Sequence, residues 1–93
     1  MEYNYLTREI HMPEKHFRKD RHIKLGKTEN MFFAVLWFSR ENKATHKQIY
    51  EKVYGCGEPN KVCLRHIARS IRNKGIPIES VYKYGYRLNI KNN

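Results

Sequence analysis

Basic, amide and apolar side chains recur through residues 59–74 at spacings of three and four. On a helix this spacing gathers Leu64, Ile67, Ala68 and Ile71 within about 100° of arc, so this side is expected to face a core. Arginine can donate two hydrogen bonds to guanine, asparagine can contact adenine or a phosphate, and valine can meet a thymine methyl group. The other side and its flank carry residues with this chemistry, namely Lys61, Val62, Arg65, His66, Arg69, Arg72 and Asn73.

A second basic group begins the segment at residues 45–54. Thr45 and Gln48 form the T-x-x-Q pattern of a capping box, and Gly55 is suited to end the helix that they start. Free backbone N–H groups at a helix start favour phosphate binding when lysines lie beside them. The sequence therefore predicts a phosphate clamp formed by Lys43, Thr45, His46 and Lys47.

Tyrosines and basic residues alternate near the end of the chain. The β-prone stretches 78–82 and 86–90 flank Lys83-Tyr84-Gly85, which predicts a hairpin with its turn at these three residues. At least one of the alternating tyrosines is expected in the core. A role of the charges in protecting a sheet edge stays open as an alternative to nucleic-acid contact. The contacts expected from the hairpin are those of Tyr82, Lys83, Tyr84 and Arg87.

The overall charge favours a polyanionic partner. Nineteen Lys and Arg residues face nine Asp and Glu residues, which gives a net charge of +10. A domain does not need this excess to fold, because like charges repel one another in the compact state. Nucleic acid is the first candidate partner, an anionic membrane surface the second, and a solvated face without a partner the third. No apolar run is long enough to span a membrane, and the first residues do not resemble a signal peptide, so a cytoplasmic protein is expected.

The elements that position these residues suggest an α+β fold in one domain, residues 1–93. We expect short strands at 1–25, three helices at 26–75 and the hairpin at 76–90. The apolar run MFFAVLWF belongs to a predicted helix at 27–39, with Gly26 as N-cap and Glu29 reaching back to it. The third helix is expected to start at Pro59 and to stop at Gly75. The short helix at 45–54, which follows the longer apolar helix after a tight turn, then gives a helix-turn-helix arrangement.

The N-terminal strands are predicted from the stretch EKHFRKDRHIKL. Lys19-Asp20-Arg21 is expected to form a turn between two short strands. The residues expected to point inward are Phe17, Ile23 and Leu25.

From about residue 23 to residue 90 the chain resembles the DNA-binding domain of the OmpR/PhoB-type response regulators. LGKTE at 25–29, THKQIYEKVYG at 45–55, IRNK at 71–74 and YKYGYRL at 82–88 are similar to that family's motifs, in the same order. The resemblance implies a winged helix whose third helix lies in the major groove and whose hairpin, the wing, reaches a minor groove. It also implies a regulator of transcription that can bind repeated half-sites as a homodimer and can contact RNA polymerase or another regulatory protein.

The chain departs from the family at several positions. Tyr82 and Lys83 stand where the wing usually has arginine and glycine, and Arg65 lies near the place of an acidic residue. No phosphate-accepting receiver domain is present in the sequence, so we expect a stand-alone module controlled by its amount, a partner or oligomerisation. In a bacterium such a protein is expected to associate with the nucleoid.

Other functions compete with duplex binding. A winged helix can present the same basic surface to an acidic protein and act as an inhibitor or anti-repressor. The tyrosine-rich hairpin can instead bind RNA or single strands. Cys56, Cys63, His66 and His46 do not have a usual zinc spacing, so no metal or other cofactor is expected. The sequence lacks paired carboxylates, a phosphate-binding glycine loop and a nucleophile elbow, which argues against an enzyme.

Overall fold

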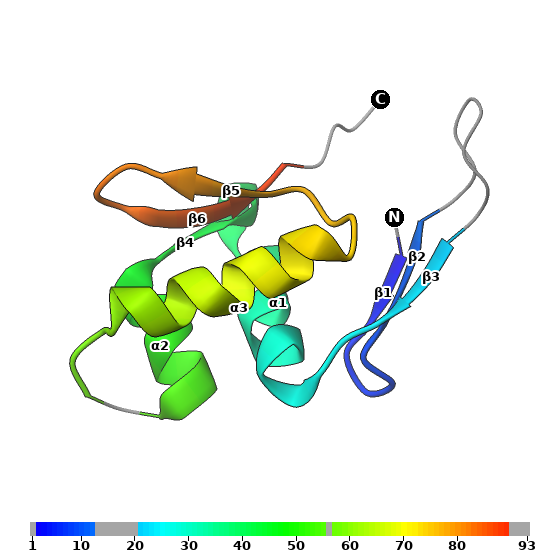
Figure 1. Ribbon diagram of the computed structural model, residues 1–93, viewed down its shortest axis with the longest axis horizontal. Helices are drawn as coiled ribbons and strands as arrows, with labels where there is room; N and C mark the ends of the chain where they lie inside the picture. The colour runs from blue at the N-terminus through cyan, green and yellow to red at the C-terminus, as the bar shows by residue number, and fades with distance from the viewer. Residues whose placement is uncertain (1, 13–20, 56, 90–93) are drawn as a thin grey trace.

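The computed structural model of the chain describes residues 2–12, 21–55 and 57–89 (Figure 1). Within these residues the fold is α+β, as predicted, with three α-helices and two three-stranded antiparallel sheets. The helices are α1 (Lys27–Phe38), α2 (His46–Tyr54) and α3 (Lys61–Asn73). The first sheet has the order β1 (Glu2–Asn4), β2 (Glu9–Met12) and β3 (Arg21–Lys24). The second has the order β4 (Lys43–Thr45), β6 (Gly85–Leu88) and β5 (Ile78–Val81).

The starts of α1 and α2 confirm the predicted caps. The Gly26 amide donates to Glu29 Oε1 at 2.7 Å at the start of α1. At the start of α2, Gln48 N donates to Thr45 Oγ1 at 3.1 Å, and Thr45 N donates to Gln48 Oε1 at 2.9 Å. Gly55 ends α2 with a φ of 90°, a conformation that glycine adopts without steric cost. Helix α1 ends at Phe38, one residue earlier than predicted.

The start of α3 was predicted wrongly. Pro59 lies before the helix, and Asn60 is the N-cap, with its side-chain oxygen accepting from the amides of Val62 and Cys63. The first amides of a helix have no partner within the helix, and the asparagine oxygen accepts hydrogen bonds from two of them. The predicted stop is close to the observed one, since α3 ends at Asn73 and Gly75 follows with a φ of 95°.

The second sheet contains a strand that the sequence analysis did not predict. Lys43, predicted as a clamp residue, begins β4, which pairs with β6 through Ala44 opposite Tyr86. A 3₁₀ turn, η1 (Arg40–Asn42), precedes it. The hairpin turn lies at residues 82–84, so Gly85 belongs to β6 and not to the turn as predicted. A Cβ on Gly85 would lie 2.0 Å from the Ala44 carbonyl oxygen, so this close pairing requires glycine.

The N-terminal sheet agrees in part with the prediction. Arg21 was expected in a turn but begins β3, which pairs with β2. Ile23 and Leu25 are buried, as predicted. Phe17 and the rest of the predicted turn lie outside the described residues.

A single cluster of buried apolar side chains joins both sheets to the helices. It includes Ile10 from the first sheet, Phe33 from α1, Ile71 from α3 and Leu88 from the second sheet. In Figure 1, α3 lies across α1 and runs beside the second sheet. This packing fixes which side of α3 remains open to the solvent. Among the described helices, none has the length and apolar character needed to cross a membrane.

Candidate nucleic-acid interface

The side of α3 that faces away from the core is basic. Leu64, Ala68 and Ile71 are buried and Ile67 packs against the core, as predicted from their spacing. The sequence of α3 contains no Asp or Glu. The exposed residues of α3 include all those predicted to contact DNA, namely Lys61, Val62, Arg65, His66, Arg69, Arg72 and Asn73.

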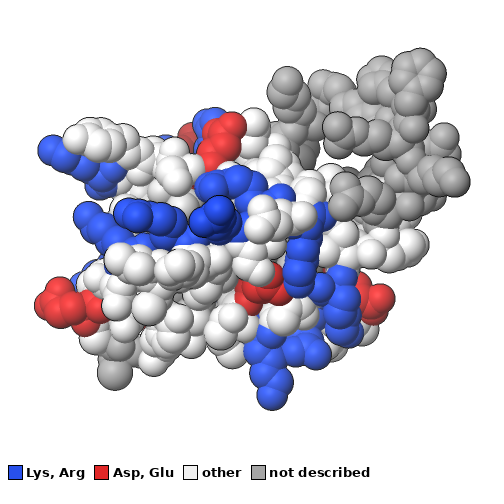
Figure 2. All heavy atoms as spheres, in the orientation of Figure 1, with Lys and Arg blue, Asp and Glu red and all other residues white. Residues whose placement is uncertain are grey.

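Positive charge extends beyond α3 on the same face of the molecule. Figure 2 shows Lys and Arg side chains in a band that lies along α3, between this helix and the second sheet. Lys and Arg atoms appear again at the tip of the β5–β6 hairpin (Figure 2). Among the described residues, Lys61, Arg65 and Arg69 take part in none of the ion pairs that the acidic side chains form. These three charges therefore remain available to a polyanion.

Tyr86 lies where the basic helix meets the second sheet. Its side chain is 5% exposed, and its ring lies 5.2 Å from the Phe32 ring and 5.7 Å from the His46 ring. Burial raises the pKa of Tyr86, and the positive charges of Arg65 and Arg72 act in the opposite direction. Tyr86 is thus the tyrosine of the hairpin that was expected in the core.

Arg72 has a structural partner that the sequence did not reveal. Its Nε donates to the carbonyl oxygen of Ile78 in β5 at 2.8 Å. This hydrogen bond holds the end of α3 against the second sheet. Arg72 therefore contributes charge to the surface, and this hydrogen bond fixes the orientation of its side chain.

The predicted phosphate clamp lies at the start of α2, a helix that contacts α3. Burial lowers the pKa of His46, and the positive charge of Lys61 acts in the same direction. Lys43 Nζ lies 5.4 Å from the centroid of the Tyr84 ring and 3.2 Å from Glu41 Oε2. The clamp residues thus adjoin both α3 and the hairpin.

The backbone of this clamp is less available than predicted. The His46 amide donates to the Tyr84 carbonyl oxygen at 3.1 Å, and the Gln48 amide donates to Thr45 Oγ1. Two of the first amides of α2 are therefore satisfied within the protein, and the expectation of free N–H groups was wrong for them. The side chain of Lys47 is exposed, so any phosphate contact here depends mainly on lysine side chains.

The tip of the β5–β6 hairpin presents an aromatic ring and a cation. Tyr82 is 87% exposed, and Lys83 Nζ lies 5.4 Å from the centroid of its ring. Lys83 has a φ of 57° within the turn at residues 82–84. Arg87 lies further from the tip and pairs with Glu79 Oε2 at 2.6 Å. Arg87 therefore differs from the other predicted contacts of the hairpin, because its charge is already paired within the chain.

A buried cluster that sequence reasoning missed ties α3 to α1. Glu29 is 7% exposed and accepts hydrogen bonds from Ser70 Oγ and, at 2.6 Å, from Lys74 Nζ. Local sequence assigned Glu29 to the cap of α1 alone. A pairing over more than 40 residues has no local signal from which it could be predicted.

The described residues among those considered for a metal site do not assemble into one. Within the described part of the chain, no group of three or more His, Cys, Asp or Glu residues is placed to hold a metal ion. Cys63 is a free thiol on α3, and Cys56 lies outside the described residues.

Comparison of the chain with protein-family models, with curated proteins and with solved structures finds no match.

Proposed function

We propose that this chain binds double-stranded DNA in a sequence-specific manner and regulates transcription, as a winged helix of the OmpR/PhoB type. The observation that carries the proposal is the open side of α3, which has several cations and no carboxylate. Such a helix can enter a major groove about 12 Å wide and approach the bases without repelling the phosphates. No cofactor and no catalytic step is involved in this function.

The dimensions of α3 suit this role. At about 1.5 Å per residue, the interval from Lys61 to Arg69 spans about 12 Å, which is close to the length of three or four base steps. Arg69 and Asn73 lie on the outer side of the helix, where they can reach base edges. Lys61 and Arg65 lie nearer the second sheet, where contact with the sugar-phosphate backbone is favoured.

The neighbouring elements supply the remaining contacts. With α3 in a major groove, Lys43 and Lys47 meet the adjacent phosphates and the hairpin tip with Lys83 reaches toward the neighbouring minor groove. About six cations then neutralise phosphates, so log K should fall with log salt with a slope near −5. They are Lys43, Lys47, Lys61, Arg65, Arg72 and Lys83.

Selection from a random duplex library, followed by a salt titration of the selected duplex against a scrambled duplex, tests the proposal. We expect a shared sequence motif, a steep salt dependence for both duplexes and tighter binding of the selected one. Failure to enrich any motif would contradict sequence-specific recognition. Absence of duplex binding at low salt, together with binding of the same surface to an acidic protein, would favour an inhibitor or anti-repressor.

One observation favours a second candidate, which is binding of single-stranded nucleic acid. Tyr82 is 87% exposed and Tyr84 is 37% exposed, and exposed aromatic rings beside cations can stack on unpaired bases. Competition between the duplex and a single strand of the same sequence distinguishes the two functions. Displacement by the single strand at equal concentration, with loss of affinity in Tyr82→Ala, would select the second.

A further inference from the structure

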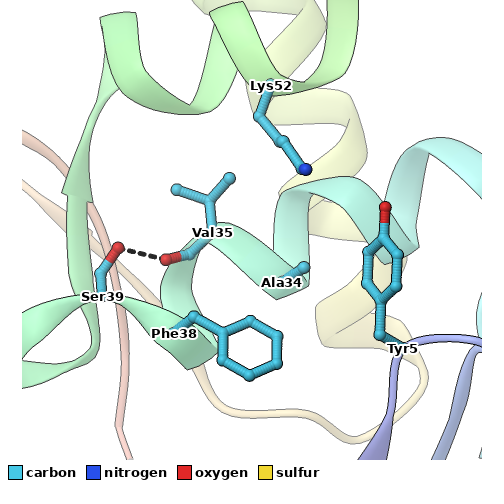
Figure 3. Close-up of a pocket in the computed structure, with 6 residues that line it drawn as sticks. All are labelled: Tyr5, Ala34, Val35, Phe38, Ser39 and Lys52. Carbon is cyan, nitrogen blue, oxygen red and sulfur yellow. Dashed lines mark hydrogen bonds between the residues drawn. The ribbon is translucent and has the colours of Figure 1, made fainter.

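A groove of about 470 Å³ lies between α1, α2 and the turn that joins β1 to β2 (Figure 3). In Figure 3 the Tyr5 ring stands at one end, Phe38 forms the floor toward the other end, and Lys52 extends from α2 toward the opening. The groove is separate from the basic surface described above. It is lined by Tyr5, Ala34, Val35, Phe38, Ser39 and Lys52.

The groove exists because α1 is apolar on all sides over its last two turns, residues 31–38. Phe33 and Leu36 on one side of the helix are buried in the core. Ala34 and Phe38, four residues apart, lie on the opposite side, where Ala34 is 3% exposed and Phe38 is 71% exposed. A helix that is hydrophobic all round is normally covered on every side. At the outer side of α1, Phe38 is thus a large apolar side chain largely without a cover among the described residues.

The rim of the groove adds further apolar area. Tyr5 is 37% exposed, and its neighbour Leu6 in the β1–β2 turn is 90% exposed. Scattered apolar residues on a surface are ordinary, but aromatic and aliphatic side chains gathered at a hollow are typical of protein contacts. An aromatic side chain such as Phe38 at the centre of such a patch is a favourable anchor for a partner.

The charge at the groove selects the chemistry of that partner. Lys52 is the charged residue of the lining, and its Nζ lies 5.6 Å from the centroid of the Tyr5 ring. The Ser39 hydroxyl donates to the Val35 carbonyl oxygen within the chain, so it is already satisfied. A second copy of this chain would bring another net charge of +10 to the contact, which opposes association. A partner with carboxylates is attracted instead.

We propose that this groove is a docking site for an acidic segment of a partner protein. An apolar side chain of that segment packs on Phe38, and a neighbouring carboxylate pairs with Lys52. The site lies on the side of α1 opposite α3, so it is open when the basic face is occupied. The chain can then connect a polyanion on one side to an acidic protein on the other.

Titration of the nitrogen-labelled chain with a short synthetic peptide, followed by NMR, tests this site. The probe carries Phe and Leu four positions apart and Asp or Glu at most other positions. One control peptide has lysines in place of the acids, and another has alanines in place of Phe and Leu. We expect amide shifts around Ala34 and Phe38, and at least about tenfold weaker binding of both control peptides.

Matched variants separate the groove from general charge attraction. Phe38→Ser and Lys52→Glu should each weaken the acidic peptide by about tenfold or more. Lys83→Glu makes the same change in charge at the hairpin tip and should change the affinity less than about threefold. Thermal unfolding of each variant checks that the fold is kept, which is expected because the three side chains are exposed.

Several results would overturn the proposal. Shifts confined to α3, equal binding of the lysine peptide, or unchanged affinity in Phe38→Ser would each exclude the groove as the acidic site. The same conclusion follows if the acidic peptide does not bind at millimolar concentration. Dimerisation of the free chain that Phe38→Ser abolishes would assign the groove to a second copy instead.

Discussion

Replacement of Glu29 by glutamine is predicted to weaken the attachment of α3 to α1. The Glu29 carboxylate accepts hydrogen bonds from the Gly26 amide at 2.7 Å, from Lys74 Nζ at 2.6 Å and from Ser70 Oγ. Ser70 lies in α3 and Lys74 caps its end. One buried carboxylate therefore holds the start of α1 and the end of α3 together.

The expected loss follows from these three hydrogen bonds. A hydrogen bond to a charged group contributes about 1.5–3 kcal/mol, and the neutral glutamine keeps one acceptor oxygen of the two. The Lys74 side chain is 34% exposed, so water can solvate its ammonium group after the carboxylate is gone. We expect Glu29→Gln to lower the free energy of unfolding by about 2 kcal/mol. The control Glu51→Gln, on an exposed residue of α2, should change it by less than about 0.5 kcal/mol.

The dependence of this loss on pH provides a second check. Burial alone would raise the pKa of Glu29, but hydrogen bonds from Lys74, Ser70 and Gly26 outweigh it, and the pKa lies below 4.5. A carboxyl group with a lowered pKa in the folded state stabilises the fold above the unfolded pKa, and this contribution is lost as pH falls through the folded pKa.

Urea unfolding of both chains over a pH series measures the effect. The difference between wild type and Glu29→Gln should be constant from about pH 8 to pH 5 and should shrink below about pH 4.5. A difference under about 0.5 kcal/mol at pH 7 would refute the reasoning. A difference that persists unchanged at pH 3 would refute it as well.

Three further predictions concern the second sheet and its neighbours. Gly85→Ala should lower the free energy of unfolding by at least about 2 kcal/mol in urea, because the new Cβ would collide with the Ala44 carbonyl oxygen. Arg87→Ala should change affinity for the selected duplex less than about threefold, because Glu79 already pairs with its charge; a tenfold loss would make Arg87 a phosphate contact. The pKa of His46 should lie below 6.5 by NMR, because the side chain is half-buried and near the positive charge of Lys61. Its contribution to stability should be complete above about pH 6.5 and fall below it, and a pKa at or above 6.5 would contradict this.

Local features of the helices were predictable from the sequence. The Thr45 and Gln48 cap depends on residues three apart, and the structure forms it as expected. The buried side of α3 follows from its 3.6-residue period, which places Leu64, Ala68 and Ile71 together. The start of α3 was misplaced because Pro59 and Asn60 both favour helix starts, and the asparagine cap prevailed.

Strand β4 could not be predicted because its partner lies far away in the chain. Lys43, Ala44 and Thr45 make a strand too short for an alternating pattern, and they pair with β6 some 40 residues later. The turn of the hairpin was shifted by one residue for the same reason, since β4 requires Gly85 inside the strand.

That shift also explains the missed ion pair in the candidate interface. A turn centred on Tyr84 would place Glu79 opposite Asn89, whereas the observed register places it opposite Arg87. The exposure of Arg65 and Arg69 followed from helical periodicity, but which cations are paired depends on strand register. The sequence therefore predicted the open face of α3 better than the charges of the hairpin.

Affinity of the Arg69→Ala variant for the selected duplex and for a scrambled duplex tests the central claim most directly. The control is Lys52→Ala, which also removes one positive charge. The Lys52 ammonium lies over the Tyr5 ring, away from α3. Arg69→Ala should cost about 1–3 kcal/mol on the selected duplex, about 5–150-fold in affinity, with a smaller loss on the scrambled one. Equal losses for both variants on both duplexes would contradict base reading by α3.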